Sequence, residues 1–378
     1  MNILITGIEG FIAKNLHVRL EAIEGFKIFG TVRDESEKDL EKKIVQADLI
    51  FHLAGENRSD QTEDFKKNNL DLTNKICKLI SKNKVQSPVI FASSLQITNN
   101  SDYGKSKKLA EHALEALSKE HGNTTFIYRL PGVFGKWARP NYNSVVATFC
   151  HNASRGITLD VHKRDEPIEL IYIDDLVDAF ISNSLNIDEI INMENKFHVI
   201  NMDNTYKVSV NDLATTISSF EENRSLKKID LISEGLYKAL YSTYLTYLPK
   251  DNYTYSIDRH EDERGVFTEF IKSSSFGQVS FFTIKIGATR GGHYHHTKVE
   301  KFLVLTGKAQ FTFKNIITKD TFDIVLEAKD SKVIETIPGL AHNIKNVGDE
   351  LLIIMAYANE IFDENNPDTY QFDINEDE

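Results

Sequence analysis

Sulfur and long apolar runs are what this chain has least of. Its 378 residues include only two cysteines, Cys77 and Cys150, which are too few and too far apart for a disulfide framework. No stretch approaches the ~18 apolar residues of a membrane-spanning helix. The first residues also lack the basic start and long apolar core of a signal peptide. We therefore expect a reduced, cytoplasmic protein with no membrane partner.

Positive charge is also in deficit, because 44 lysines and arginines face 56 acidic residues and the net charge is −12. Bulk electrostatics therefore argue against a nucleic-acid partner, and an anionic substrate would need local basic side chains. Hydrophobic residues make up 41% of the chain and charged residues 26%, which is ordinary for a globular protein. The length predicts two domains.

The first half of the chain alternates short apolar strands with amphipathic helices. The segments NILITG, FKIFGTVR, ADLIFHLAG and SPVIFASS have the composition of buried strands, and GFIAKNLHVRLEAI between the first two has a helical period. Strands separated by helices predict a doubly wound parallel sheet of α/β class.

The turn after the first strand, TGIEGFIA, carries Gly7 and Gly10 just before the expected helix. A pyrophosphate needs backbone amides at close range and the positive end of a helix, and a side chain at either position would obstruct it. The spacing departs from the strict Gly-x-Gly-x-x-Gly fingerprint. Taken alone, the turn is equally consistent with a plain strand-turn-helix unit.

A second motif, YGKSK, places Tyr103 and Lys107 four residues apart on one face of a helix. A phenol can exchange a proton with a carbonyl substrate if its pKa is lowered, and a nearby ammonium group would lower it. The segment FASS ends the fourth strand and offers Ser94 as a hydroxyl that could polarise the same carbonyl. The combination predicts a carbonyl reductase site.

Residues 1 to about 240 resemble an extended short-chain dehydrogenase/reductase of the kind that acts on nucleotide sugars. The resemblance rests on TGIEGFIA, HLAG, SS, YGKSK, RLPGVFG and LIYIDDLVDAF. It implies that Tyr103 is the acid/base, that Lys107 lowers its pKa and holds the nicotinamide ribose, and that Ser94 binds the substrate oxygen. It also implies a cofactor site formed by Gly7, Gly10, Phe11, Ile12, Arg33, Ala54, Gly55, Tyr103, Lys107 and, beside the nicotinamide, Pro131.

The choice of cofactor depends on the end of the second strand, TVRDES. Arg33 could stack on adenine and pair with a 2′-phosphate, which favours NADPH. Asp34 could instead bind a bare ribose hydroxyl, which favours NADH, and both could be solvated loop charges. We expect NADPH, because no acid occupies the last position of the strand.

The pattern changes near PKDN, the best turn signal in the middle of the chain, and we expect domains at 1–247 and 252–378. The second region has short alternating runs such as VSFFTIKI, KFLVLTG and AQFTFKN, with no long helix between them. That pattern predicts an all-β domain, an antiparallel sandwich or barrel.

The segment 287–307 matches the first motif of the cupins, which are jelly-roll proteins, and IPGLAHNIKN is close to the second. His293 and His295 lie two apart on a strand and should point together into the barrel. We expect Glu300 on the next strand and His342 across the barrel. Together they predict a site for one divalent metal, with zinc as the first choice. The alternative is a polar hairpin with solvated histidines.

The segment HEDERGVFTEF resembles the start of the deoxysugar 3,5-epimerases. That resemblance implies that Arg264 holds a substrate phosphate and that Glu269 approaches the nucleotide or sugar. In those epimerases the histidine at the position of His293 is the base, whereas here it lies in a metal motif. The base is therefore open between water activated by the metal, Lys301 and His293 itself.

The whole chain, through TGIEGFIA, YLTYLP, DERGVFTEF, HYHHTKVEKFLV and NPDTYQF, resembles the bifunctional capsular-polysaccharide enzymes of UDP-N-acetyl-L-fucosamine synthesis. The resemblance implies a homodimer whose cupin domain epimerises carbon 3 of a UDP-linked 4-keto sugar and whose reductase domain reduces carbon 4 with NADPH. Two other interpretations are a reductase whose cupin is only a metal-stabilised dimerisation module, and a sugar-nucleotide sensor. YGKSK with Ser94 argues against the sensor.

Overall fold

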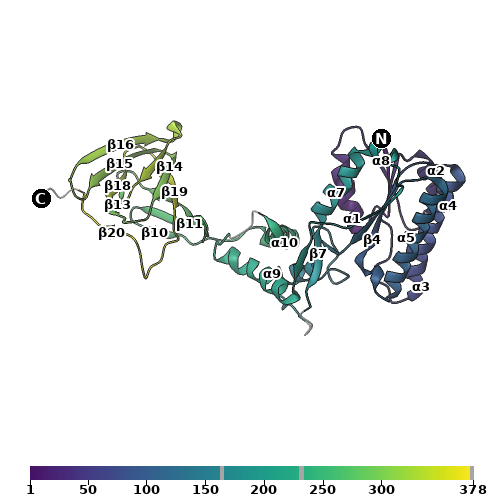
Figure 1. Cartoon of the computed structure of the whole chain (residues 1–378). Coiled ribbons are helices and arrows are strands. Elements are labelled where there is room, and N and C mark those ends of the chain that lie inside the picture. The colour runs from purple at the N-terminus through teal and green to yellow at the C-terminus, as the bar shows by residue number, and fades with distance from the viewer. Residues whose placement is uncertain (162–165, 230–233, 375–378) are drawn as a thin grey trace. The chain divides into compact units, whose positions relative to one another are not determined.

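The structure is a computed structural model that describes residues 1–161, 166–229 and 234–374 (Figure 1). It contains a parallel sheet flanked by helices in the first part of the chain and two antiparallel sheets in the last part. The predicted fold class, a doubly wound α/β domain followed by an all-β jelly-roll domain, is confirmed.

Contacts divide the chain into two compact units. The N-terminal unit comprises Met1–Ser218 and Glu234–Pro249, and the C-terminal unit comprises Ser219–Ser233 and Lys250–Glu378. Helix α9 (Val210–Ser225) therefore begins in one unit and ends in the other. The stretch Ser219–Ser233 thus belongs with the β-rich unit. The expected domains, 1–247 and 252–378, place it in the first domain.

The N-terminal unit is built on a six-stranded parallel sheet with the order β2-β1-β3-β4-β5-β8. Strand β1 has β2 on one side and β3 on the other, so the chain reverses its direction of winding there. In such sheets, ligands bind in the crevice at the carboxyl ends of the strands at this switch point. The strands are β1 (Asn2–Thr6), β2 (Lys27–Thr31), β3 (Leu49–His52), β4 (Val89–Ser94), β5 (Thr125–Leu130) and β8 (Phe197–Ile200).

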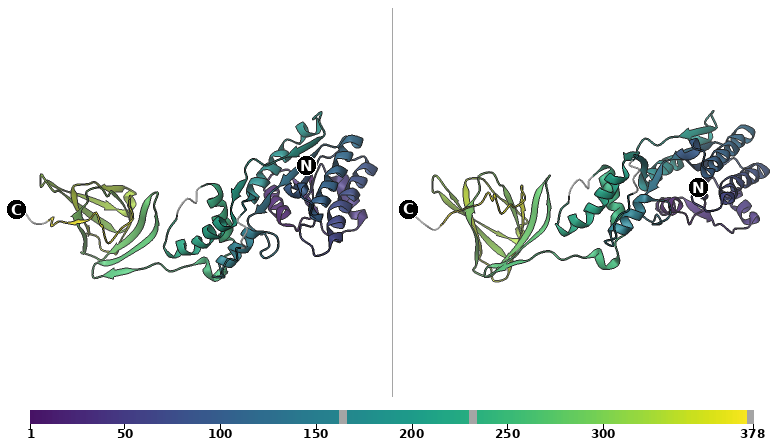
Figure 2. Two further views of the ribbon diagram at one scale, coloured as in Figure 1. Left: turned by 60° about the horizontal axis from the view of Figure 1, so that its bottom comes forward. Right: turned by 90° about the horizontal axis from the view of Figure 1, so that it is seen from below.

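Helices cover both faces of this sheet, as Figures 1 and 2 show. Side chains alternate along each strand, so Ile3 and Ile5 join the core under α1 and α7, while Leu4 joins the core under α2, α4 and α5. The helices of this unit are α1 (Phe11–Glu21), α2 (Glu37–Gln46), α3 (Thr62–Phe65), π-helix η1 (Lys66–Asp71), α4 (Leu72–Asn83), 3-10 helix η2 (Leu95–Thr98), α5 (Asp102–His121), α6 (Val145–Ala153), α7 (Ile173–Leu185), α8 (Ile187–Ile191) and α10 (Gly235–Leu245).

A second, small sheet, β6-β7-β9, extends this unit beyond the main one. Its strands are β6 (Gly132–Phe134), β7 (Ile168–Tyr172) and β9 (Tyr206–Val208). Tyr247, just after α10, ties this region together, because its hydroxyl donates to the carbonyl of Ala138. The 3-10 helix η3 (Lys250–Tyr253) follows and opens the second part of the C-terminal unit.

An ion pair lies behind the carboxyl end of β4. The Arg129 guanidinium on β5 donates to the buried Glu111 carboxylate on α5, with Nη2 2.8 Å from Oε2, and the Ser93 hydroxyl also donates to Glu111. Replacing Arg129 by methionine should lower the free energy of unfolding by about 3 kcal/mol, because Glu111 would stay buried without its cation. Urea unfolding followed by the fluorescence of Trp137, the one tryptophan of the sequence, measures this unit directly.

The control for this prediction is Lys119→Met on the same helix, which breaks an exposed pair with Glu115. Exposed pairs contribute about 0–1 kcal/mol, so this variant should unfold close to the wild type. Equal effects of the two substitutions would show that the Arg129 pair contributes no more than a surface pair.

The C-terminal unit is a sandwich of two antiparallel sheets, ordered β10-β11-β12-β19-β14-β17 and β16-β15-β18-β13-β20. Apolar side chains from both inner faces, including Phe302 and Phe311, form one core between them. The strands are β10 (His260–Asp262), β11 (Gly265–Ser273), β12 (Gly277–Ile284), β13 (Thr289–Tyr294), β14 (Glu300–Thr306), β15 (Lys308–Asn315), β16 (Thr321–Glu327), β17 (Val333–Thr336), β18 (Leu340–Asn346), β19 (Leu352–Ala358) and β20 (Tyr370–Gln371), with 3-10 helix η4 (Ala328–Asp330).

The stretch after α9 is attached to the edge of this sandwich. Lys228 bridges to Lys272 of β11 in parallel, and the N–H of Ile229 donates to the carbonyl of Lys272. The Lys227 ammonium lies between the carboxylates of Asp258, at 2.9 Å, and Glu269, at 3.3 Å. These contacts explain why the stretch groups with the C-terminal unit.

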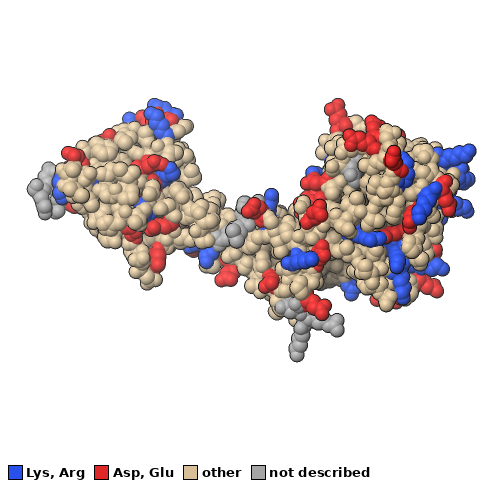
Figure 3. Space-filling model, viewed as in Figure 1, with Lys and Arg blue, Asp and Glu red and all other residues tan. Residues whose placement is uncertain are grey.

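Charged side chains of both signs are interspersed on the surface of the N-terminal unit seen in Figure 3. The net negative charge is therefore not gathered there into one acidic patch. Among the helices of the described residues, none is both long and apolar enough to cross a membrane.

Candidate active site and metal centre

The turn after β1 packs directly against the segment after β3. Gly7 has a φ of +64°, and a Cβ there would lie 2.8 Å from the Cα of Ala54. The Thr6 hydroxyl accepts from the N–H of Ala54 at 3.1 Å and contacts the buried His52 ring at 2.9 Å. The two segments predicted to hold the cofactor thus meet at the switch point of the sheet.

Helix α1 begins at this turn, so its N-terminus lies at the carboxyl end of β1. Gly10 is the N-cap and provides no side-chain hydrogen bond to the first turn, where Phe11 and Ile12 lie. The N–H groups of a helix N-terminus are donors with a positive end charge, which suits the pyrophosphate of a dinucleotide. Ala54 and Gly55 follow β3 at the same edge of the sheet, and Pro131 lies between β5 and β6. The residues present fit a dinucleotide.

Helix α5 carries Tyr103 and Lys107 on one face, next to the end of β4, as predicted. Tyr103 is hydrogen-bonded with Ser94, the last residue of β4. Burial raises the pKa of the Tyr103 phenol above its ordinary value, and the bond with Ser94 opposes the rise. The predicted lowering of this pKa by Lys107 is not observed, since the Lys107 ammonium donates instead to the carbonyl of Ala92 at 2.8 Å.

Lys107 is buried, and its surroundings strongly change the pKa of its ammonium group. Burial lowers the pKa of its ammonium to about 8, and the negative charge of Glu111 opposes the shift. The Nζ lies 4.7 Å from the centre of the Phe91 ring. Lys107 therefore keeps its proton at neutral pH but by a small margin.

Asn69, which no pattern in the sequence singled out, is buried in the π-helix η1. Its side-chain amide accepts from the N–H of Glu56 at 2.9 Å and donates to the carbonyl of Glu56 and to the Ser106 hydroxyl. A Cβ on Gly55 would come within 2.6 Å of the Asn69 Oδ1 and 3.2 Å of the Lys107 Nζ. Asn69 thus holds the loop after β3 against α5. In the sequence, the one sign of this role was an asparagine within an amphipathic segment.

Arg33 follows β2 and is 69% exposed. Its guanidinium pairs with the Glu56 carboxylate at 2.7 Å, and the Tyr142 hydroxyl donates to the same carboxylate at 2.9 Å. The carboxylate beside Arg33 thus comes from the loop after β3. Arg33 is accessible to a ligand, but Glu56 competes for its charge.

In the C-terminal unit, the side chains of His293, His295, Glu300 and His342 converge. Each offers one ligand atom, and these atoms lie within 4.8 Å of one another. The Nε2 of His295 is 3.1 Å and that of His342 is 3.4 Å from the same oxygen of Glu300. The predicted set of four residues is therefore brought together, although its role as a metal site stays a prediction.

One detail of the predicted arrangement is wrong. His342 does not lie across the barrel from His293, because β18 and β13 are hydrogen-bonded neighbours and these two residues are opposite each other in the register. Glu300 is the residue of the set that comes from the facing sheet, as the first residue of β14. The sandwich is closed by strand pairing between distant segments, and local spacing does not reveal which strands become neighbours.

The electrostatics of the cluster suit a cation. Burial opposes ionisation of Glu300, yet hydrogen bonds from His295 and His342 and the charge of Lys298 hold the pKa of its carboxyl below the ordinary value. Burial, with His342 next in importance, lowers the pKa of His293 to about 4, so its imidazole is neutral at pH 7. The Nδ1 of His342 is buried without a hydrogen-bond partner among the described residues.

The donor set fits a divalent metal. Three imidazole nitrogens and one carboxylate oxygen are the ligands that zinc and other first-row divalent ions take. A buried carboxylate is costly unless a cation or hydrogen bonds compensate its charge. His296, in contrast, is exposed and packs its ring on Tyr370, so it is not part of the cluster, as expected.

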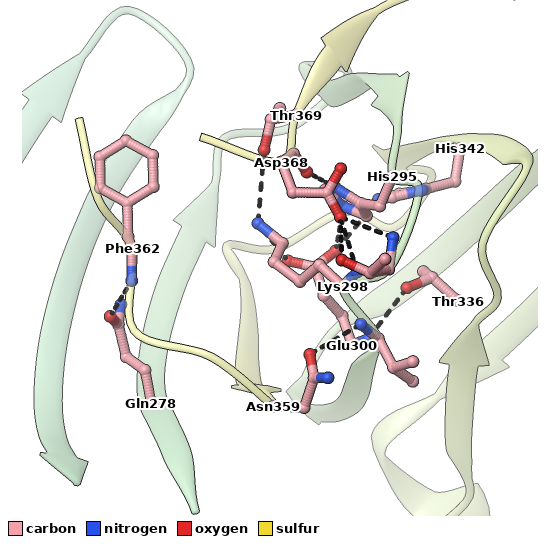
Figure 4. Close-up of polar contacts among 12 residues, drawn as sticks. Gln278, His295, Lys298, Glu300, Thr336, His342, Asn359, Phe362, Asp368 and Thr369 are labelled. Atoms are coloured by element: carbon pink, nitrogen blue, oxygen red, sulfur yellow. Dashed lines mark hydrogen bonds and ion pairs between the residues drawn. The ribbon is translucent and has the colours of Figure 1, made fainter. Parts of the chain in front are cut away.

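The lysine beside the cluster is Lys298 and not Lys301. Lys298 is 12% exposed, and its Nζ lies 3.7 Å from Glu300 and 3.4 Å from the Thr369 hydroxyl (Figure 4). Lys301 is next to Glu300 on β14, so its side chain points to the opposite face, where it pairs with Glu335. The hypothesis that Lys301 is the base does not agree with this geometry.

The two predicted substrate residues lie elsewhere in the sandwich. The Arg264 guanidinium donates to the Asp262 carboxylate at 2.6 Å, and Arg290 of β13 donates to the same carboxylate at 3.0 Å. Glu269 accepts from Lys272 and contacts Lys227, at the edge where the stretch after α9 is attached. Arg264 thus has a second arginine beside it, whereas Glu269 is engaged in structural ion pairs.

Comparison with known proteins agrees with the two units. Residues 3–193 match the NAD dependent epimerase/dehydratase family, and residues 260–370 match the Polysaccharide biosynthesis C-terminal domain. A protein of Pseudomonas aeruginosa strain PA103, named UDP-2-acetamido-2,6-beta-L-arabino-hexul-4-ose reductase, is 40% identical, and the match covers 100% of both chains. The chain belongs to this reductase family.

A solved structure extends the match of this reductase-family chain to three dimensions. The capsular polysaccharide assembling protein CapF from Staphylococcus aureus is 37% identical with a TM-score of 0.90, over 99% of this chain and 100% of that chain. UDP-glucuronic acid 4-epimerase from Bacillus cereus, in complex with NAD, is 17% identical with a TM-score of 0.56, over 65% of this chain and 98% of that chain. The latter shows a shared fold alone.

Proposed function

We propose that this chain carries out two consecutive reactions on one UDP-linked 4-keto-6-deoxy-N-acetylhexosamine. The C-terminal unit epimerises carbon 3, and the N-terminal unit reduces the ketone at carbon 4 with NADPH, towards UDP-N-acetyl-L-fucosamine for capsule or O-antigen. The observation that carries the proposal is the pairing, in one reductase-family chain, of the Tyr103, Lys107 and Ser94 group with the buried histidine cluster. We also propose that the enzyme is a cytoplasmic homodimer.

For the reduction, the bound nicotinamide supplies a hydride to carbon 4. Tyr103 has a raised pKa and is protonated at neutral pH, so it can donate its proton to the oxygen that becomes the alcohol. Ser94 holds the phenol by a hydrogen bond and offers its own hydroxyl to the same oxygen. Lys107 keeps its proton at neutral pH and would hold the nicotinamide ribose from the same helix face.

For the epimerisation, the ketone at carbon 4 makes the proton on carbon 3 acidic, so a base can remove it and return it to the other face. His293, His295, Glu300 and His342 would hold a divalent ion, which when bound supplies positive charge for the oxygen of the enolate. Lys298 adds a second positive charge beside Glu300. With Lys301 on the opposite face, Lys298 is the lysine that can take part in proton transfer.

The order of the two reactions follows from their energetics. Epimerisation interconverts two similar sugars and is reversible. Hydride transfer from NADPH to a ketone is downhill, so the second reaction removes the epimer and draws the first reaction forward.

The test is NMR of the 4-keto substrate in heavy water, with and without NADPH. The proposal expects exchange of the carbon 3 proton for deuterium without NADPH, and reduction only when NADPH is added. Reduction with no exchange under either condition would favour the alternative, a reductase whose C-terminal unit is a metal-stabilised dimerisation module.

Cofactor preference should depend on Arg33. Replacing it by alanine should raise the KM for NADPH by about 10-fold or more and change the KM for NADH little, because only NADPH offers a phosphate to the guanidinium. Steady-state kinetics with both cofactors measure the difference.

The matched variant is Glu56→Gln, which removes the carboxylate that competes for Arg33 in this structure. It should leave the KM for NADPH unchanged or lower it. Equal effects of Arg33→Ala on the two cofactors would mean that Arg33 is a solvated charge with no role in discrimination.

A further inference from the structure

The segment after β19 returns to the histidine cluster and closes the loop between β13 and β14. The Asp368 carboxylate accepts from three successive backbone N–H groups of that loop, those of His296 at 2.9 Å, Thr297 at 2.7 Å and Lys298 at 2.7 Å. It also accepts from the Thr297 hydroxyl at 2.9 Å. Figure 4 shows Asp368 beside His295 and Lys298, with several of the polar contacts meeting at its carboxylate.

The same residue contacts a cluster histidine through its backbone. The Nδ1 of His295 is hydrogen-bonded to the carbonyl oxygen of Asp368. A carbonyl only accepts, so Nδ1 is the donor to Asp368, and Nε2 is the nitrogen directed at Glu300, 3.1 Å away. A hydrogen bond of this kind at the second ring nitrogen sets the tautomer and orientation of a metal-binding histidine.

Neighbouring residues of the segment strengthen the attachment. The Thr369 hydroxyl accepts from the Lys298 ammonium at 3.4 Å. Strand β20 then pairs with β13, with Gln371 opposite His293, and the N–H of Phe372 donates to the carbonyl of Gly292 at 2.8 Å. The segment is thus an added edge strand of the sheet that carries two of the histidines.

The loop held by Asp368 is important because cluster residues stand at both of its ends. His295 precedes it and Glu300 follows it. Motion of the loop would therefore change the distance between these two candidate ligands. Ordering a loop residue costs about 1–2 kcal/mol, and a site that is ordered before the ion arrives avoids that cost on binding. One carboxylate with four hydrogen bonds provides this order.

We propose that Asp368 is a positioning residue of the metal centre, which orients His295 and holds the loop 296–298 so that the four ligands converge before the ion binds. The inference rests on the proposed metal site. It adds a residue that touches no ion and lies 68 positions after Glu300 in the sequence.

The experiment compares zinc binding by full-length variants after removal of metal with a chelator. In competition with a chromogenic chelator, Asp368→Ala should raise the Kd for zinc about 10- to 100-fold, the usual effect of losing such a partner. Asp368→Asn retains an acceptor oxygen without the charge and should have an intermediate Kd. With cobalt(II) in place of zinc, the visible absorption spectrum of Asp368→Ala should differ from that of the wild type.

The matched control is Asp363→Ala, in the same segment, whose carboxylate accepts from the N–H of Asn365 and not from the loop. It should bind zinc as the wild type does. Circular dichroism establishes that each variant is folded. If Asp368→Ala is unfolded, the Kd of Asp368→Asn decides.

Two different failures are distinguishable. Wild-type protein that binds no zinc or cobalt removes the proposed metal site, and this inference with it. If the wild type binds zinc and folded Asp368→Ala has a Kd for zinc within about twofold of the wild-type value, only the positioning role is overturned. Where the alanine variant is unfolded, the same criterion applies to folded Asp368→Asn.

Discussion

Replacing Tyr103 by phenylalanine should abolish oxidation of NADPH by the 4-keto sugar while leaving proton exchange at carbon 3 intact. The phenol is the group placed to give a proton to the new alcohol, since it is held by Ser94 and lies on the same helix face as the buried Lys107. Loss of a general acid typically costs 10²- to 10⁴-fold in rate. Absorbance of NADPH and NMR in heavy water measure the two activities on one sample.

The control is Tyr247→Phe, which removes a phenol from the same unit whose hydroxyl only donates to the Ala138 carbonyl. It should reduce the ketone at close to the wild-type rate. If Tyr103→Phe also did so, the assignment of the acid would be wrong. If it lost exchange at carbon 3 as well, the two reactions would share one site.

Replacing His342 by alanine should remove the divalent ion and lower the melting temperature of the C-terminal unit. Wild-type protein should contain about one ion per chain by elemental analysis, because four ligands converge. An ion that binds only the folded state stabilises it by about 4 kcal/mol at 1,000 times its Kd. Part of the fall in melting temperature comes from losing the ion. That part equals the rise in melting temperature that added zinc causes in metal-free wild-type protein and not in the variant.

The matched control is His296→Ala in the same run of histidines. Its side chain is exposed and its ring packs edge-to-face with Tyr370, outside the cluster, so metal content and the zinc-dependent rise in melting temperature should be unchanged. An ion that persists in His342→Ala at full stoichiometry would contradict the proposed ligand set.

The same variant separates a catalytic ion from a structural one. Four protein ligands can close a tetrahedral site, whereas catalytic zinc keeps one position open. Exchange at carbon 3 is measured in His342→Ala at a temperature where its fold is intact. Persistence of exchange would make the ion structural and assign proton transfer to a side chain such as Lys298. Loss of exchange, with reduction of a pre-epimerised ketone preserved, would make the ion part of the epimerisation.

Local patterns in the sequence determined the elements and many of the candidate residues. The period of TGIEGFIAKNL places Gly7 and Gly10 at a strand-to-helix turn, and four-residue spacing places Tyr103 and Lys107 on one helix face. Two-residue spacing brings His293 and His295 to one side of the sheet. These results depend on backbone geometry within a few residues, which the sequence specifies directly.

Contacts between distant segments were decided by the tertiary structure alone. Strand pairing makes His342 the neighbour of His293 and brings Glu300 from the facing sheet. The carboxylate beside Arg33 is Glu56, from the loop after another strand. The phenol of Tyr103 has a raised pKa because of burial, which depends on everything packed around it.

Two residues beside the cluster, Lys298 and Asp368, show most clearly that local sequence does not determine contacts between distant segments. Lys301 and Lys298 are both close to Glu300 in the sequence, but the alternation of β14 sends Lys301 to the outer face, and the loop before it turns Lys298 towards the cluster. Asp368 has no motif, and its bonds to the loop exist only because the segment after β19 folds back on β13. Residue types and short spacings therefore identified the candidate ligands, while the groups that contact them were set by the packing of the sandwich.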